Sequence, residues 1–385
     1  MDILDNRTIH LSPVHPIQLE NAEEYLLDID TIRYATTGNI NAWDSNRFFE
    51  EATQMLINAI ALFEQGFFDA AFYSMRESIE ISIGTLYLTA NRNKLKEWQQ
   101  QKNGFDNAVM AKFLREHEET FKEMREKMKP FFDNIWNTEK KINKYVHKQG
   151  FDKFYIHLWN KNNYQKRVRK IKEDFESYLT VCIGAVAVYR LALDAMPIAL
   201  MDEDLLMRSP DLLTQPYTED LVNKYIGKEA ITSYKKTSFY QAYREFLSNR
   251  PKQNEAVFNL IHYQLFERKY IDSYISQFNQ LSLTDRIAAV IFSSSDKISQ
   301  LYVNGLIWYF SDVKPIRKDR SNTYGSNYFE QFFHFADNFN VDFKGVYLSR
   351  INIHGDYTYI EHNEWLDEHE QAFLRKMAVE MTDKI

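Results

Sequence analysis

The sequence predicts a mainly α-helical protein: an N-terminal antiparallel helical bundle, followed by a second, mostly helical domain with a small β-hairpin. Glycine and proline are scarce, at 11 and 8 of 385 residues, which favours long helices. Hydrophobic residues make up 44% of the chain, and in the first half they recur at helical spacing. Because a chain of this length is expected to form about two domains, we place the domains at residues 1–200 and 201–385.

Long helices account for most of the first half. Asp44 is a candidate N-cap for the first helix, and Gly66 ends it with a turn so short that the next helix should run antiparallel. A polar loop is expected at 89–104, and Pro130 should kink or restart the third helix because it removes a backbone donor. Pro197 ends the fourth helix. The four helices are expected near 45–65, 67–90, 106–147 and 166–196.

Shorter elements follow a linker or irregular crossover at 201–218, which contains two prolines. The stretch 341–362 is rich in β-branched and aromatic residues around Gly355, which predicts the hairpin. An amphipathic helix is expected at 364–384. Further helical patterns occur at 219–226, 229–249, 252–267, 269–279, 283–293 and 296–310.

The segment 137–172 is strongly basic within an acidic protein. It holds eleven Lys and Arg residues against two acidic ones, whereas the whole chain has a net charge of −7. Aromatic residues are interleaved with these charges, which suits a polyanion whose bases can stack. The alternative is an ordinary solvated helix face. The candidate nucleic-acid-binding residues are Lys144, Lys148, Lys166, Arg167, Arg169 and Lys170.

Composition also argues against several classes of protein. The single Cys182 excludes an internal disulfide framework and a multi-cysteine zinc cluster, so we expect a reducing, cytoplasmic location. The first residues lack the apolar stretch of a signal peptide, and the longest apolar run, at 178–189, is too short to span a bilayer. Nucleotide-binding loops and the nucleophile motif of α/β-hydrolases are absent from the sequence. We therefore expect no cofactor, no metal and no membrane association.

Two segments, 62–88 and 140–150, resemble a HEPN domain, the helical family found in many bacterial toxins, anti-phage effectors and RNases. The resemblance covers about residues 44–196. In that family, a second helix with small residues and a Glu precedes a later motif in which an Arg is followed, after four to six residues, by a His. The residues of this chain that match these patterns are Ala70, Ala71, Arg76, Glu80 and His147.

The chain departs from the family motif at the basic position. Lys141 and Lys140 precede His147, with five and six residues between, where the family has Arg. A lysine ammonium lacks the planar guanidinium fork that binds a phosphate through two hydrogen bonds. In addition, Gln149 stands where a modified subset of the family has Tyr.

The resemblance implies metal-independent RNA cleavage at a site shared by two protomers. His147 would assist proton transfer, for which an imidazole titrating near ~6.5 is suited, and a basic residue would hold the scissile phosphate. Two alternatives stay open: Arg76 and Glu80 form only an i,i+4 pair, and His147 only closes a helix end beside Gly150. The candidate catalytic residues are His147, Lys141, Lys140, Glu80 and Arg76.

Two functional hypotheses follow. The first is a homodimeric, HEPN-like RNA-targeting protein of a bacterial defence or toxin system, acting as a metal-independent ribonuclease whose second domain senses a trigger or restrains the first. The second is a catalytically inactive module or scaffold that binds RNA, or a protein partner from the same system, through the same basic surface. The missing Arg favours the second hypothesis, and the charge of segment 137–172 fits both.

Overall fold

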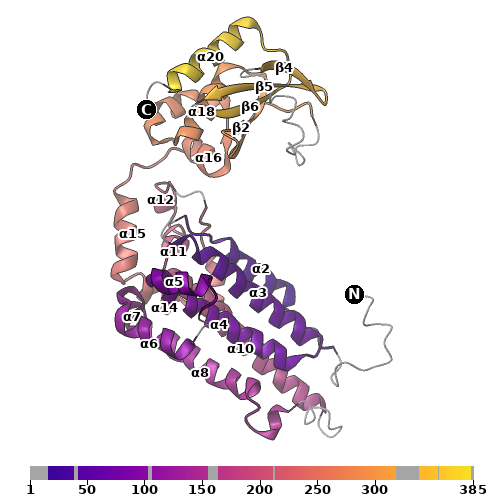
Figure 1. Ribbon diagram of the computed structural model, residues 1–385, viewed down its shortest axis with the longest axis vertical. Helices are drawn as coiled ribbons and strands as arrows, with labels where there is room; N and C mark the ends of the chain where they lie inside the picture. Colours follow the sequence, from indigo (N-terminus) through magenta and orange to yellow (C-terminus); the bar gives the residue numbers. More distant parts are fainter. Residues whose placement is uncertain are drawn as a thin grey trace. The chain divides into compact units, whose positions relative to one another are not determined.

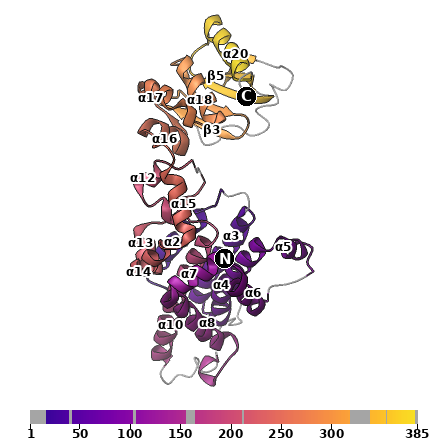
Figure 2. The same ribbon diagram turned by 90° about the vertical axis from the view of Figure 1, so that its left-hand side faces the viewer.

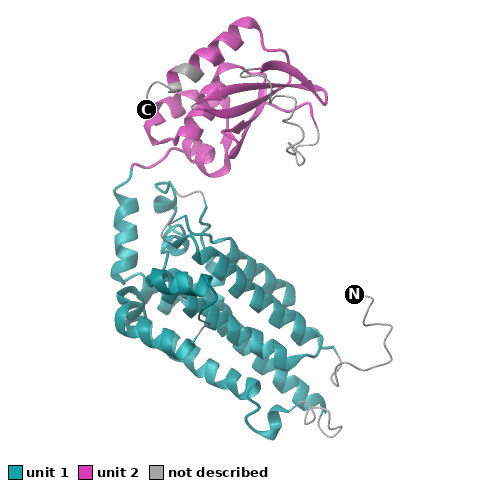
Figure 3. Cartoon of the chain, viewed as in Figure 1, with its two compact units in different colours: residues 1–250 teal, residues 251–385 magenta. Residues whose placement is uncertain are grey.

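The computed structural model describes residues 16–38, 42–102, 106–154, 164–210, 213–317, 338–353 and 355–382. The chain divides into two compact units, residues 1–250 and 251–385 (Figure 3). Unit 1 is helical, and unit 2 combines helices with a six-stranded sheet (Figures 1 and 2). The predicted mainly helical class with an N-terminal bundle is confirmed, whereas the β element is larger than the expected hairpin.

Unit 1 contains the long helices that the sequence predicts near 45–65, 67–90 and 166–196. The expected helix at 106–147 is instead three helices, because the backbone leaves helical geometry at Glu118 and again at Met128. The side chain of Glu118 caps the second helix by accepting from Phe121 N. Pro130 is the second residue of the third helix, in the first turn, where its missing donor has no intrahelical acceptor to lose. The expected polar loop at 89–104 contains a helix. The helices are α2 (Ala22–Tyr34), α3 (Ser45–Glu64), α4 (Phe68–Ala90), α5 (Arg92–Gln99), α6 (Asn107–His117), α7 (Glu119–Lys127), α8 (Lys129–Val146) and α10 (Tyr164–Leu191).

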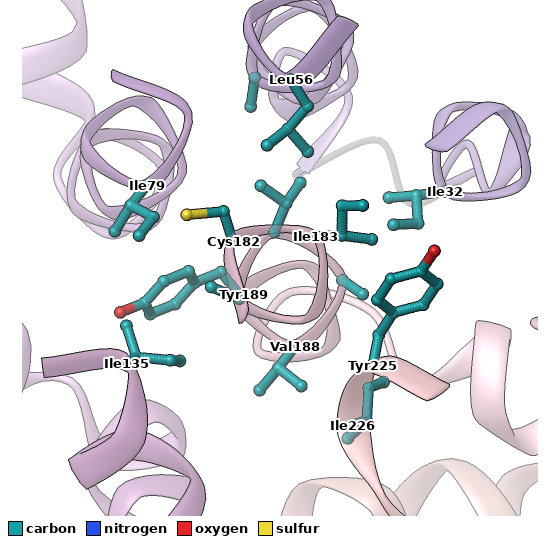
Figure 4. Packing of buried hydrophobic residues seen from close by; sticks show 14 of the residues in the cluster. Ile32, Leu56, Ile79, Ile135, Cys182, Ile183, Val188, Tyr189, Tyr225 and Ile226 are labelled. Carbon is teal, nitrogen blue, oxygen red and sulfur yellow. The ribbon is translucent and has the colours of Figure 1, made fainter. Parts of the chain in front are cut away.

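Helix α10 lies at the centre of the unit 1 core. Figure 4 shows Cys182 and Ile183 of α10 surrounded by side chains from the neighbouring helices, among them Leu56 of α3 and Ile79 of α4. Gly184 permits the closest of these contacts, since a Cβ at this position would lie 2.2 Å from the carbonyl oxygen of Tyr225. The bundle core is therefore built around one helix that neighbours contact on several sides.

Residues 201–250 belong to unit 1, so the boundary expected at residue 200 differs from the observed division at 250. Tyr217 donates a hydrogen bond to the carbonyl of Ala187 (3.1 Å), and Tyr234 donates one to the carbonyl of Leu191 (2.9 Å). Both acceptors are on α10, and both tyrosines are buried in the bundle core. This segment forms α11 (Met196–Ala199), α12 (Glu203–Leu206), α13 (Glu219–Leu221), the π-helical turn η3 (Val222–Ile226), α14 (Lys228–Tyr234) and α15 (Ser238–Ser248).

Unit 2 has one six-stranded sheet in the order β1-β3-β2-β6-β5-β4. All neighbouring strands are antiparallel except β1 and β3. The strands are β1 (Leu265–Phe266), β2 (Ile298–Val303), β3 (Ile307–Ser311), β4 (Asn338–Phe343), β5 (Val346–Ile353) and β6 (Asp356–His362). The accompanying helices include α16 (Glu255–Tyr263), α17 (Ile271–Ser276), α18 (Leu283–Ser294) and α20 (Glu368–Thr382).

The predicted hairpin near 341–362 is part of this sheet. Strands β5 and β6 meet at Gly355, which has a positive φ of 87°. The prediction of a helix at 296–310 is wrong. This stretch forms the hairpin β2–β3, and β2 pairs with β6. Among the described residues, no helix of either unit is long and apolar enough to cross a membrane.

Candidate active site

The candidate site lies where α4 packs against α8. The two helices run antiparallel, so residues late in α8 meet residues early in α4. Lys148 forms an ion pair with Asp69, and the rings of Tyr145 and Phe72 stack with centroids 4.1 Å apart. This register brings His147 next to α4.

Three of the expected catalytic residues come together in this register. Arg76 is held by Glu80, whose Oε1 lies 2.6 Å from both Nε and Nη2. The remaining nitrogen, Nη1, lies 3.3 Å from Nε2 of His147. Because a guanidinium only donates, Nε2 is the acceptor if this contact is a hydrogen bond. Arg76 on α4 thus places a guanidinium beside His147.

Both alternatives noted for these residues also have a structural basis. The i,i+4 ion pair of Arg76 and Glu80 is present. His147 occupies the C-cap position of α8, and its backbone N–H donates to the carbonyl of Asn143. The ring of His147 is nevertheless free of the core, because the residue is exposed.

A cavity of about 340 Å³ opens beside this contact. Arg76 and Glu80 line one wall, and Lys140 and Asn143 of α8 line another. Arg76 therefore connects the cavity to His147. The volume lies in the range of about 300–1,000 Å³ that is usual for small-ligand sites.

The two candidate lysines of the motif point in different directions, as consecutive helical residues do. The Nζ of Lys140 lies 4.7 Å from the ring centroid of Trp136, at the cavity. The Nζ of Lys141 lies 5.8 Å from the ring centroid of Tyr178 on α10. Only Lys140 is thus brought to the cavity with Arg76 and Glu80.

Glu139 also lines the cavity, although it belongs to none of the sequence motifs. Burial and the nearby carboxylate of Glu80 raise the pKa of Glu139 to about 7, although Arg76 acts in the opposite direction. The sequence spacing could have indicated Glu139 as a site residue. It stands four residues before Asn143 and eight before His147, which places all three on one helix face. The site therefore contains a carboxyl group that titrates near neutrality.

The expected nucleic-acid-binding residues lie around the end of α8 and the start of α10. Lys144 is exposed on α8, whereas Lys148 is half-buried in its ion pair with Asp69. On α10, Lys166, Arg169 and Lys170 are exposed and Arg167 is half-buried. The interleaved aromatic residues at 155–163 lie outside the described residues. Tyr145 ties the two helices together, because its hydroxyl donates to Asp174 of α10 at 2.6 Å.

Within the part of the chain that the structure describes, no three His, Cys, Asp or Glu side chains are grouped so that they could hold a metal ion.

Comparison with protein families, with curated proteins and with solved structures found no match. The resemblance to HEPN domains accordingly stays a prediction from the sequence motifs.

Proposed function

We propose that unit 1 is a HEPN-like RNA-targeting domain of a bacterial defence or toxin system, and that it cleaves RNA at the site of Arg76 and His147. The observation that supports this most is the 3.3 Å contact between Arg76 Nη1 and His147 Nε2 beside a cavity. A phosphate-binding fork and a proton-transfer group are the two components that metal-independent cleavage of RNA requires.

In the proposed reaction, Nη1 of Arg76 leaves His147 and turns to the bound phosphate, which frees Nε2 of His147. Nε2 then accepts the proton of a ribose 2′-hydroxyl, whose oxygen attacks the adjacent phosphorus. The bond from phosphorus to the 5′-oxygen breaks, and the leaving oxygen takes the proton back from His147. The products are a 2′,3′-cyclic phosphate and a free 5′-hydroxyl, and the imidazole is regenerated. Arg76, oriented by Glu80, would hold the phosphate oxygens as negative charge develops on them. Lys140 would add positive charge from the other wall of the cavity.

A catalytically inactive binding module is the second candidate function. The observation that favours it is the placement of Lys141, which stands at the motif's basic position yet lies over Tyr178. In this case, the exposed lysines and arginines of α8 and α10 would bind RNA, or a protein partner from the same system, without cleavage.

A homodimer is part of the proposal, because the resemblance implies a site shared by two protomers. A two-fold arrangement would bring two copies of Arg76 and His147 together. Light scattering at micromolar concentration should then give about twice the chain mass of 45.9 kDa, and a monomer would contradict this part of the proposal.

The test of the proposed function compares His147→Ala with His369→Ala, which alters an exposed histidine in unit 2. We expect His147→Ala to abolish RNA cleavage while leaving RNA affinity largely unchanged, because the surrounding basic residues supply most of the binding. The control variant should cleave like the wild type. A chelator should not change the rate of cleavage by the wild type or by the control. Equal cleavage by both variants would overturn the catalytic role, and binding without cleavage by the wild type would favour the inactive module.

A further inference from the structure

We propose that the cavity beside Arg76 is a subsite for one unpaired nucleobase, which stacks on Trp136 and donates its exocyclic amino group to an asparagine side chain. This inference rests on the proposed function, because it defines the substrate of the same site as single-stranded RNA.

The stacking surface is Trp136. This side chain lines the cavity and yet is 54% exposed, which leaves ring surface available to a ligand. Lys140 lies against the ring, with Nζ 4.7 Å from its centroid. An aromatic ring next to a cation is the combination by which proteins bind a base and its phosphate together.

The hydrogen-bonding groups are Asn107 of α6 and Asn143 of α8, which both line the cavity. The Oδ1 atom of each is buried and has no hydrogen-bond partner among the described residues. Buried acceptors without a donor are rare and unfavourable. The amino group of adenine, cytosine or guanine carries two hydrogens and can donate to both oxygens, whereas uracil can offer only the single N–H of its ring N3.

The rest of the cavity suits a flat ring that is followed by a phosphate. Ile83, Phe132 and Ile135 give it an apolar lining. Arg115 and Arg125 line both this cavity and a neighbouring one of about 270 Å³, so positive charge continues away from His147. A base paired within a duplex stays stacked in the helix and does not reach such a site, whereas an unpaired base does.

Calorimetric titration of the full chain with AMP, CMP, GMP and UMP tests the subsite without depending on cleavage. We expect UMP to bind about fivefold more weakly than the other three, because one hydrogen bond is missing. Trp136→Ala should weaken binding of the amino-bearing nucleotides about tenfold, since it removes the stacking surface. Trp136→Phe should restore most of the affinity. Trp43→Ala, which alters a tryptophan of similar exposure in the same unit, should leave binding unchanged.

A second titration uses single-stranded and duplex oligonucleotides with His147→Ala protein, which is expected to leave them intact. The subsite predicts that single-stranded binding depends on Trp136 and that duplex binding does not. If Trp136→Ala and Trp43→Ala bind nucleotides equally well, the subsite is overturned even where the wild type cleaves RNA. If mononucleotides depend on Trp136 and oligonucleotides do not, the ligand is a free nucleotide and the RNA subsite is overturned. A third outcome is that mononucleotides and single-stranded oligonucleotides both depend on Trp136 while the wild type does not cleave RNA. This outcome would overturn the catalytic function and support the subsite.

Discussion

Arg76 is the residue that most changes the interpretation of the sequence motif. The sequence places Lys141 at the motif's basic position, but its ammonium lies over Tyr178, and the guanidinium next to His147 comes from α4. Spacing along one helix could not reveal this, because the contact joins residues 71 positions apart. The pair Arg76 and Glu80 was visible in the sequence as an i,i+4 pair, and its proximity to His147 required the packing of two helices.

The first prediction concerns these basic residues. Arg76→Lys should lower the rate of RNA cleavage at least about tenfold, because an ammonium cannot contact Glu80 and a phosphate in the two-pronged way that a guanidinium can. Lys141→Gln and Lys141→Arg should leave the rate within about twofold of the wild type, since the side chain points to α10. Initial rates on one RNA substrate measure all three. A larger effect at position 141 than at position 76 would show that the motif lysine is the functional one.

The second prediction follows from the raised pKa of Glu139. Below about pH 4.5 the carboxyl is protonated in both the folded and the unfolded state, but between 4.5 and 7 only the unfolded state loses its proton. The free energy of unfolding should therefore fall as pH rises through this range, by up to about 3 kcal/mol for this group. The free energy of unfolding of Glu139→Gln should not show this decrease, because Gln does not titrate.

Chemical unfolding of the wild type and of Glu139→Gln between pH 4.5 and 8 measures the difference. Glu119→Gln is the control, because the side chain of Glu119 is 84% exposed, and its pH dependence should match that of the wild type. Parallel curves for the wild type and Glu139→Gln would contradict the assignment.

At the scale of the elements, α10 depends on Gly184. Ala is ordinarily about 1 kcal/mol more favourable than Gly inside a helix. At this position the added Cβ would meet the carbonyl oxygen of Tyr225 at 2.2 Å, and the overpacking should instead destabilise unit 1 by about 1–3 kcal/mol. Calorimetric melting of Gly184→Ala measures whether the substitution stabilises or destabilises unit 1. A rise in melting temperature would mean that α10 and η3 are not packed as described.

The elements of unit 1 were easier to predict than those of unit 2. Helices α3 and α4 begin and end within a few residues of the prediction, because a long apolar stripe and the turn at Gly66 define them locally. Strands β2 and β3 were predicted as one helix, since their apolar residues also fit a helical spacing. The missed signal was Asn304-Gly305, an Asn-Gly pair in which both residues have positive φ, as tight hairpin turns require. The long-range pairing of β2 with β6 could not be predicted from local spacing.

At the scale of the whole molecule, the division into two units makes a prediction about truncation. A chain of residues 1–250 should unfold cooperatively, whereas a chain of residues 1–200 should not, because it lacks Tyr217, Tyr234 and Leu247, which are buried in the bundle core. Losing several large buried side chains exposes apolar surface worth about 2 kcal/mol or more for each. Near-ultraviolet circular dichroism during heating measures the cooperativity. Equal melting of the two chains would restore the boundary at residue 200.

A double-mutant cycle on RNA cleavage tests most directly whether Arg76 and His147 act together on one scissile phosphodiester. Groups that act as a unit are strongly non-additive, so removing the second one costs little once the first is gone. We predict that Arg76→Ala, His147→Ala and the double variant cleave at nearly the same low rate, each at least about a hundredfold below the wild type. Rate losses that multiply in the double variant, or single variants that cleave like the wild type, would contradict the shared site.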